Sequence, residues 1–118
     1  MEKLLFLDDE PSLLEIAPLL FEEFDVFASD DCNNILHLIE NFKPDVIMLD
    51  VVLGVHDGTK ICQAIKQHPV FKNIPVILMT AGFLRERDKL AGADGFVEKP
   101  FNTDKCISLL NQLTNRKI

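Results

Sequence analysis

Basic residues are scarce in this chain of 118 residues. It contains 12 Lys and Arg against 19 Asp and Glu, which gives a formal net charge of -7 at pH 7 and a pI of about 4.8. A nucleic-acid-binding surface needs clustered Lys and Arg, and attraction to an anionic membrane surface needs the same residues. The composition therefore argues against direct binding of nucleic acid or of a membrane.

Cysteines and long apolar runs are also few. The three cysteines are Cys32, Cys62 and Cys106. They form no C-x-x-C pair, and an odd number without a secretory signal favours reduced thiols in a cytoplasmic protein. The apolar run Leu4–Leu7 is too short for a signal-peptide core, and no other run approaches the length of a membrane span. Since no repeat or low-complexity tract divides the chain, we expect one domain over residues 1–118.

Short apolar runs alternate with longer amphipathic segments along the chain, and 47% of the residues are hydrophobic. The predicted strands are 4–7, 26–28, 46–49, 76–79 and 96–98. The predicted helices run from Pro11 to Phe24, from a cap at Ser29–Asp31 to Phe42, from Asp57 past Ile65, from Leu84 to Ala91, and from Asn102 or Thr103 past Leu113. Five βα units in a row predict an α/β fold with a five-stranded parallel sheet and helices on both faces. Right-handed crossovers leave few topologies, and we expect the flavodoxin-like order 2-1-3-4-5.

The first helix carries a specific expectation about its buried face. The residues expected inward are Leu13, Ile16, Leu20 and Phe24. Pro11 suits a first helical turn, whereas Pro18 would remove a backbone hydrogen bond from the helix interior. We therefore expect a kink at Pro18 or a helix that starts late.

Polar side chains stand at the carboxyl ends of four predicted strands. Asp8 and Asp9 follow the first strand, Asp50 the third, Thr80 the fourth and Lys99 the fifth. Ligands of open α/β sheets bind beyond these ends, and the four strands are neighbours in the expected order. Taken singly, each residue could be a turn residue, a helix cap or a surface charge. Taken together, they predict one polar site at one edge of the sheet.

The predicted site suits phosphoryl transfer to a carboxylate. Close carboxylates repel one another unless a cation intervenes, and Mg²⁺ prefers carboxylate, water and phosphate oxygens. Asp50 could then attack phosphorus as a nucleophile and form an aspartyl phosphate. Mg²⁺ and the Lys99 ammonium would stabilise the charge on the transferred group, and the Thr80 hydroxyl would donate a hydrogen bond to it.

Several motifs resemble the signature of the CheY-like receiver domains of response regulators in two-component signalling. The matching segments are Phe6–Glu10, Val46–Asp50, Asp57–Gly58, Pro75–Ala81, Gly92–Phe96 and Lys99–Phe101. The resemblance covers essentially the whole chain. It implies that Asp50 is the phosphoacceptor, that Lys99 is its charge partner across a cis bond to Pro100, and that Thr80 and Phe96 are the switch residues.

The resemblance also implies a cofactor and partners. Asp9 and Asp50 would bind Mg²⁺ directly, Asp8 directly or through water, and Val52 through its backbone carbonyl. The phosphodonor would be a histidine kinase or a histidine phosphotransfer protein, and phosphorylation would change how the domain regulates a partner or output domain. The protein would catalyse only its own phosphorylation and dephosphorylation. The sequence indicates neither the downstream effector nor the oligomeric state.

Three features depart from the family pattern. Leu53-Gly54 stands where the family often has Met-Pro, and Phe96 stands where Tyr is common. The stretch from Thr80 to Gly92 is about one helical turn shorter than the family pattern, which predicts a shortened fourth helix.

Two other functions fit parts of the pattern. An aspartate-nucleophile phosphatase of the haloacid-dehalogenase type would need a second carboxylate two residues after the nucleophile. Val52 occupies that place after Asp50, and although Glu10 lies two residues after Asp8, the Pro11 that follows fits that family poorly. A receiver-like scaffold that acts without phosphorylation would not need the acidic and basic residues that are present.

Overall fold

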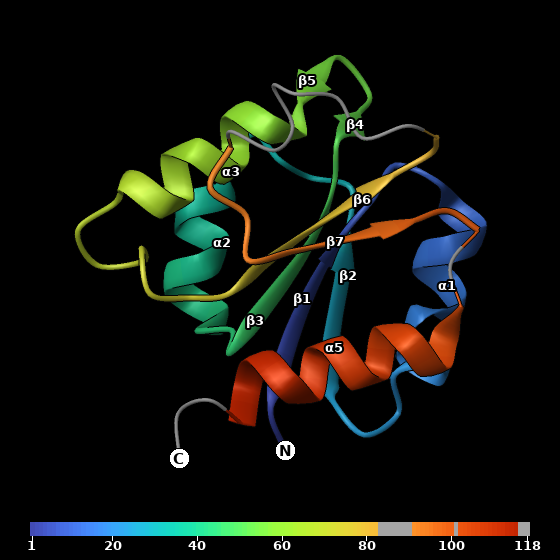
Figure 1. Cartoon of the computed structure of the whole chain (residues 1–118). Helices are drawn as coiled ribbons and strands as arrows, with labels where there is room; N and C mark the ends of the chain where they lie inside the picture. The colour runs from blue at the N-terminus through green and yellow to red at the C-terminus, as the bar shows by residue number, and fades with distance from the viewer. Residues whose placement is uncertain (83–90, 101, 116–118) are drawn as a thin grey trace.

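A single parallel sheet forms the centre of the molecule (Figure 1). The computed structural model describes residues 1–82, 91–100 and 102–115. The strands are β1 (Lys3–Leu7), β2 (Asp25–Ser29), β3 (Val46–Asp50), β6 (Val76–Thr80) and β7 (Gly95–Glu98). They pair in parallel in the order β2-β1-β3-β6-β7. The predicted order 2-1-3-4-5 and the five predicted strands are confirmed.

Helices cover both faces of the sheet, as predicted. The helices are α1 (Pro11–Leu20), α2 (Ile35–Phe42), α3 (Gly58–Gln67) and α5 (Thr103–Asn115). In Figure 1, α1 and α5 lie on one face and α2 and α3 on the other. Because strand side chains alternate between faces, Leu5 and Leu7 pack in the cluster on the α2 and α3 side, and Leu4 and Phe6 pack with α1 and α5. The predicted fourth helix falls mainly on residues 83–90, which lie outside the described residues.

The first helix differs from the prediction in its length and in one residue of its buried face. It ends at Leu20, four residues before the expected end, and Pro18 lies within it. A proline cannot donate the helical hydrogen bond, and the helix ends less than one turn after it. Ile16, expected to face inward, is 43% exposed, whereas Ala17 and Phe21 are fully buried. Of the four residues predicted to face inward, Leu13 and Leu20 pack against the core and Phe24 is buried, so only Ile16 was placed wrongly.

The second helix begins later than its predicted cap. Its first residue is Ile35, and Asn34 at the N-cap makes no side-chain hydrogen bond to the helix. The Ser29 hydroxyl accepts a hydrogen bond from the backbone N–H of Asp31, and the Asp31 carboxylate accepts one from Asn33. These short polar side chains stabilise local turns rather than a helix start. The predicted inward side chains of this helix do pack against the core.

The sequence pattern missed a small hairpin between β3 and α3. Strands β4 (Val52–Leu53) and β5 (His56–Asp57) pair antiparallel. Two-residue strands are too short to give an apolar periodicity. The predicted cap of α3 is confirmed, because the Asp57 carboxylate accepts a hydrogen bond from the backbone N–H of Thr59. No helix in the described part of the chain has the length and apolarity needed to span a bilayer.

Candidate functional site

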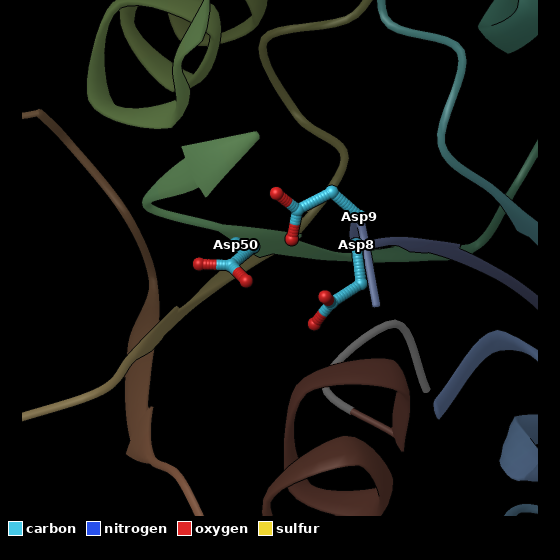
Figure 2. A group of neighbouring side chains, drawn as sticks. All are labelled: Asp8, Asp9 and Asp50. Atoms are coloured by element: carbon cyan, nitrogen blue, oxygen red, sulfur yellow. The ribbon is translucent and has the colours of Figure 1, made fainter. Parts of the chain in front are cut away.

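Three carboxylates meet at the carboxyl edge of the sheet. Leu7 of β1 pairs with Leu49 of β3, so Asp8 and Asp50 occupy corresponding places on adjacent strands. Asp9 is the next residue of the chain. One oxygen from each of the three carboxylates lies within 4.8 Å of the others, and the three side chains converge in Figure 2. The structure thus brings together the three acids that the sequence placed at the ends of two different strands.

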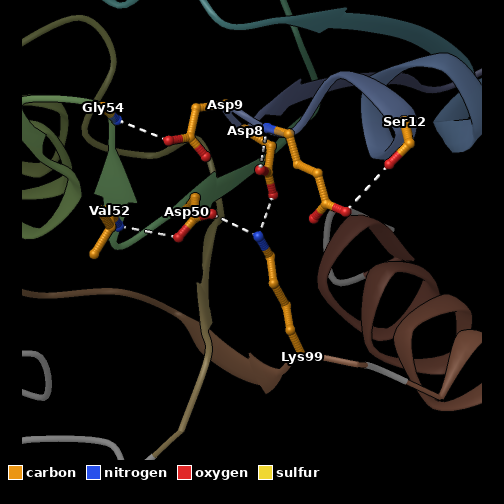
Figure 3. A network of polar contacts seen from close by, with 8 residues as sticks. Asp8, Asp9, Ser12, Asp50, Val52, Gly54 and Lys99 are labelled. Carbon is orange, nitrogen blue, oxygen red and sulfur yellow. Dashed lines mark hydrogen bonds and ion pairs between the residues drawn. The ribbon is translucent and has the colours of Figure 1, made fainter.

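Lys99 lies between two of these acids (Figure 3). Its Nζ is 2.6 Å from Asp50 Oδ2 and 2.6 Å from Asp8 Oδ2. The residue follows β7, and its backbone N–H donates a 2.7 Å hydrogen bond to the Thr80 carbonyl at the end of β6. Burial alone would lower the pKa of Lys99, but the two carboxylates raise it above 10.5 overall. The side chain is therefore held as an ammonium ion.

Asp50 is fixed by two donors. Its Oδ1 accepts a 2.9 Å hydrogen bond from the backbone N–H of Val52, and its Oδ2 accepts one of 2.6 Å from Lys99. The residue is only 6% exposed. Burial raises the pKa of the Asp50 carboxyl and outweighs the hydrogen bonds from Lys99 and Val52, and the nearby Asp8 raises it further. Without a metal ion, the ionised form of Asp50 is thus destabilised in the folded protein.

This destabilisation gives a prediction for metal-free protein. Because the folded-state pKa of Asp50 lies above its ordinary value of 3.8, the folded state holds the proton more tightly than the unfolded state. Stability is then lost as pH rises through the folded-state pKa. In EDTA, Asp50→Asn should melt at a higher temperature than the wild type at pH 7, and the gap should narrow toward pH 4. An equal or lower melting temperature of the variant at pH 7 would contradict this reading.

The other two acids have different surroundings. Asp8 is fully buried, and its Oδ1 accepts a 3.0 Å hydrogen bond from the backbone N–H of Glu10. Within the described part of the chain, its Oδ2 has no hydrogen-bond partner, so its contact with Lys99 is an ion pair. Asp9 is exposed, and its Oδ2 accepts a 3.0 Å hydrogen bond from the backbone N–H of Gly54.

The two predicted switch residues lie on neighbouring strands. Thr80 ends β6, is 5% exposed, and donates a long hydrogen bond of 3.4 Å to the Gly82 carbonyl. Phe96 of β7 is half-buried, pairs with Leu78 of β6, and packs against the core on the α2 and α3 side. The Lys99–Pro100 bond is cis, as the resemblance implied. The roles of Thr80, Phe96 and the Val52 carbonyl remain predictions.

Gly58 is a site residue whose role sequence reasoning missed. A Cβ atom at this position would lie 2.0 Å from the backbone oxygen of Asp50, and the Gly58 N–H donates a 2.7 Å hydrogen bond to the Val51 carbonyl. The first residue of α3 thus packs directly against the backbone of the candidate phosphoacceptor. The Asp57–Gly58 pair was visible in the sequence, but only the fold shows what the glycine contacts.

The donor set fits a hard divalent cation. Mg²⁺ prefers carboxylate oxygens and water, and the cluster supplies carboxylates from Asp8, Asp9 and Asp50 within reach of one another. The buried Asp8 Oδ2 faces the same site, where it pairs with the Lys99 ammonium. A cation here would also relieve the repulsion between Asp8 and Asp50.

Comparison with known proteins decides the family. The sequence profile of the response regulator receiver domain matches residues 4–111. The chain belongs to the response regulator receiver family. The receiver domain of the Francisella response regulator 1452 is similar at 28% identity and a TM-score of 0.87, with 100% of each chain covered. The chemotaxis protein CheY4 of Vibrio cholerae is similar at 25% identity and a TM-score of 0.85, covering 96% of this chain and 98% of that one.

The receiver fold also occurs within larger signalling proteins. The receiver domain of a signal transduction histidine kinase from Syntrophus aciditrophicus is 26% identical, with a TM-score of 0.86 over 98% of this chain and 91% of that one. Receiver domains are in general signalling modules rather than turnover enzymes. Membership therefore supports a role in two-component signalling and leaves the phosphodonor and the output to be proposed.

Proposed function

We propose that this receiver domain is a phosphorylation-dependent switch whose phosphoacceptor is Asp50. The observation that carries the proposal is the position of the Lys99 ammonium, 2.6 Å from the Asp50 carboxylate and beside two further acids. A lysine in this position neutralises charge where a phosphoryl group would arrive. The hydrogen bond from the backbone N–H of Val52 holds the nucleophile in one orientation.

In the proposed transfer step, one bond to phosphorus forms while another breaks. An Asp50 carboxylate oxygen forms a bond to phosphorus while the bond from phosphorus to the donor's leaving group breaks, and the leaving group takes that electron pair. Lys99 then pairs with an oxygen of the transferred group. Asp8, Asp9, Asp50 and the Val52 carbonyl would hold Mg²⁺, which supplies charge neutralisation when bound.

We assign the switch to Thr80 and Phe96. The Thr80 hydroxyl makes only a 3.4 Å hydrogen bond, which is weak by the usual distance criteria, so it can rotate toward a phosphoryl group on Asp50 at small cost. Phe96, half-buried on the adjacent strand, would move inward as Thr80 moves. The change would alter the surface that a partner or output domain contacts.

The phosphodonor that fits this chemistry is a histidine kinase or a histidine phosphotransfer protein, in the cytoplasm. Lysines and arginines are too few for direct binding of nucleic acid to be part of the proposal. One receiver domain over residues 1–118 accounts for all of these assignments.

Two measurements test the proposed function. Purified protein is incubated with Mg²⁺ and acetyl phosphate and weighed intact, with EDTA as the control. We expect one added phosphoryl group that depends on Mg²⁺. We also expect Mg²⁺ to raise the melting temperature by mass action. No added mass and no thermal shift would favour the scaffold, and sustained turnover of an aryl phosphate would favour the phosphatase.

A further inference from the structure

Asp9, the exposed acid of the cluster, accepts a hydrogen bond from the backbone of another element. The Gly54 N–H lies in the turn of the β4–β5 hairpin and donates a 3.0 Å hydrogen bond to Asp9 Oδ2, across 45 positions of the sequence. Figures 2 and 3 agree that the other Asp9 oxygen is directed toward Asp8 and Asp50. One oxygen of Asp9 is thus anchored to the hairpin while the other faces the candidate ion site.

Gly54 can make this contact because of its backbone conformation. Its φ is +59°, in the left-handed region that glycine adopts readily and that other residues except asparagine and aspartate largely avoid. A Cβ at this position would meet nothing within 4 Å. The requirement at this position is therefore for a backbone N–H with a positive φ, rather than for a small side chain.

We propose that the backbone N–H of Gly54 is a positioning donor that fixes the Asp9 carboxylate for binding a divalent cation. An exposed aspartate in water samples several side-chain rotamers. A hydrogen bond from outside the ligand shell selects one, and loss of such a bond typically weakens metal binding roughly 10- to 100-fold. This inference rests on the proposed function, because it assumes the Mg²⁺ site.

The proposal distinguishes this chain from receivers that have proline at the matching position. Proline has no backbone N–H, so it cannot supply the Asp9 contact. The Gly54–Asp9 hydrogen bond also couples the hairpin to the ion site. If the hairpin turn raises the affinity of Asp9 for the ion, then the bound ion must stabilise the ordered turn by the same factor.

The first test is isothermal titration with Mg²⁺, which suits a chain without Trp or Tyr as optical reporters. Gly54→Pro removes the N–H and also excludes the positive φ that directs it toward Asp9, so it should weaken binding about tenfold or more. Gly54→Asn keeps the N–H and tolerates a positive φ, so it should bind as the wild type does. Equal binding by Gly54→Pro and wild type, or equal loss in Gly54→Asn and Gly54→Pro, would overturn the proposal.

The second test needs no phosphorylation, and its main comparison needs no metal. Amide hydrogen exchange by NMR in EDTA compares the Gly54 and Val52 N–H groups in wild type and in Asp9→Ala. Gly54 should exchange faster in the variant, while Val52, whose acceptor is Asp50, should not change. In the wild type, Mg²⁺ should slow exchange at Gly54. Unchanged Gly54 exchange in Asp9→Ala would refute the contact itself.

The two tests separate this inference from the proposed function. If the wild type binds no Mg²⁺, the proposed function fails. If the wild type binds Mg²⁺ and Gly54→Pro binds it equally well, only the role of Gly54 fails.

Discussion

Replacing Lys99 with alanine is expected to slow phosphorylation of Asp50 by acetyl phosphate roughly 10²- to 10³-fold, the usual effect of removing one charged or hydrogen-bonding group that stabilises a transition state. In the wild type the ammonium lies 2.6 Å from Asp50 Oδ2. No other lysine or arginine in the described part of the chain forms an ion pair with Asp50. The rate is measured as the growth of the phosphorylated species by intact mass spectrometry.

Mg²⁺ should reduce the loss of folding stability that Lys99→Ala causes. Without the metal, Lys99→Ala leaves two buried carboxylates without their counter-ion, and breaking a buried pair can cost about 3–5 kcal/mol. Saturating Mg²⁺ should return most of that stability, since it offsets the same charges. It should not return the phosphorylation rate, because it does not replace the ammonium.

Lys66→Ala is the matched control. Lys66 forms a 2.9 Å ion pair with Asp94 and donates to the Ile74 carbonyl, away from the acidic cluster. Its removal should lower the stability and leave phosphorylation unchanged. If Lys99→Ala in Mg²⁺ lost stability and phosphorylation rate in the same proportion, its role would be structural and the assignment would be wrong.

Gly58→Ala is expected to destabilise the fold by about 3 kcal/mol or more, at the upper end for overpacking. The added methyl carbon would lie 2.0 Å from the Asp50 backbone oxygen and 2.9 Å from the Val51 Cα. Backbone atoms cannot rotate away as a side chain can, so either α3 or the end of β3 must move. The φ of Gly58 lies outside the left-handed region, so the cost comes from contact and not from backbone strain.

Urea denaturation measures this effect directly. Lys60→Ala, at an exposed position of the same helix, is the control and should change stability by no more than about 0.5 kcal/mol. A Gly58→Ala variant as stable as the control would show that the end of β3 can move freely. The position of Asp50 would then not depend on α3.

Sequence reasoning predicted the parts of the site that depend on strand ends. Apolar runs of four residues followed by Asp predict where the strands before Asp8 and Asp50 stop, and the short strand 96–98 places Lys99 at its own carboxyl end. Parallel pairing then brings Asp8, Asp50 and Lys99 to one edge. The alternation of elements and the handedness of crossovers left few sheet orders, and the choice of 2-1-3-4-5 among them rested partly on analogy with flavodoxin-like folds.

The parts it missed depend on contacts between distant residues. The hairpin at Val52–Asp57 is too short to produce a periodic pattern. The clash that requires Gly58 and the hydrogen bond from Gly54 to Asp9 exist only after β3, α3 and β1 have assembled. In α1, a leucine-rich stretch allows several apolar faces, and packing rather than periodicity buried Ala17 in place of Ile16.

Asp50, and no other acid of the cluster, should carry the phosphoryl group. Borohydride reduces an aspartyl phosphate to homoserine, which peptide mass spectrometry locates to a single residue. After treatment with acetyl phosphate and Mg²⁺, we expect homoserine at position 50 alone, and none in Asp50→Asn. Homoserine at position 8 or 9, or an unreduced Asp50 in protein that has gained phosphoryl mass, would contradict it.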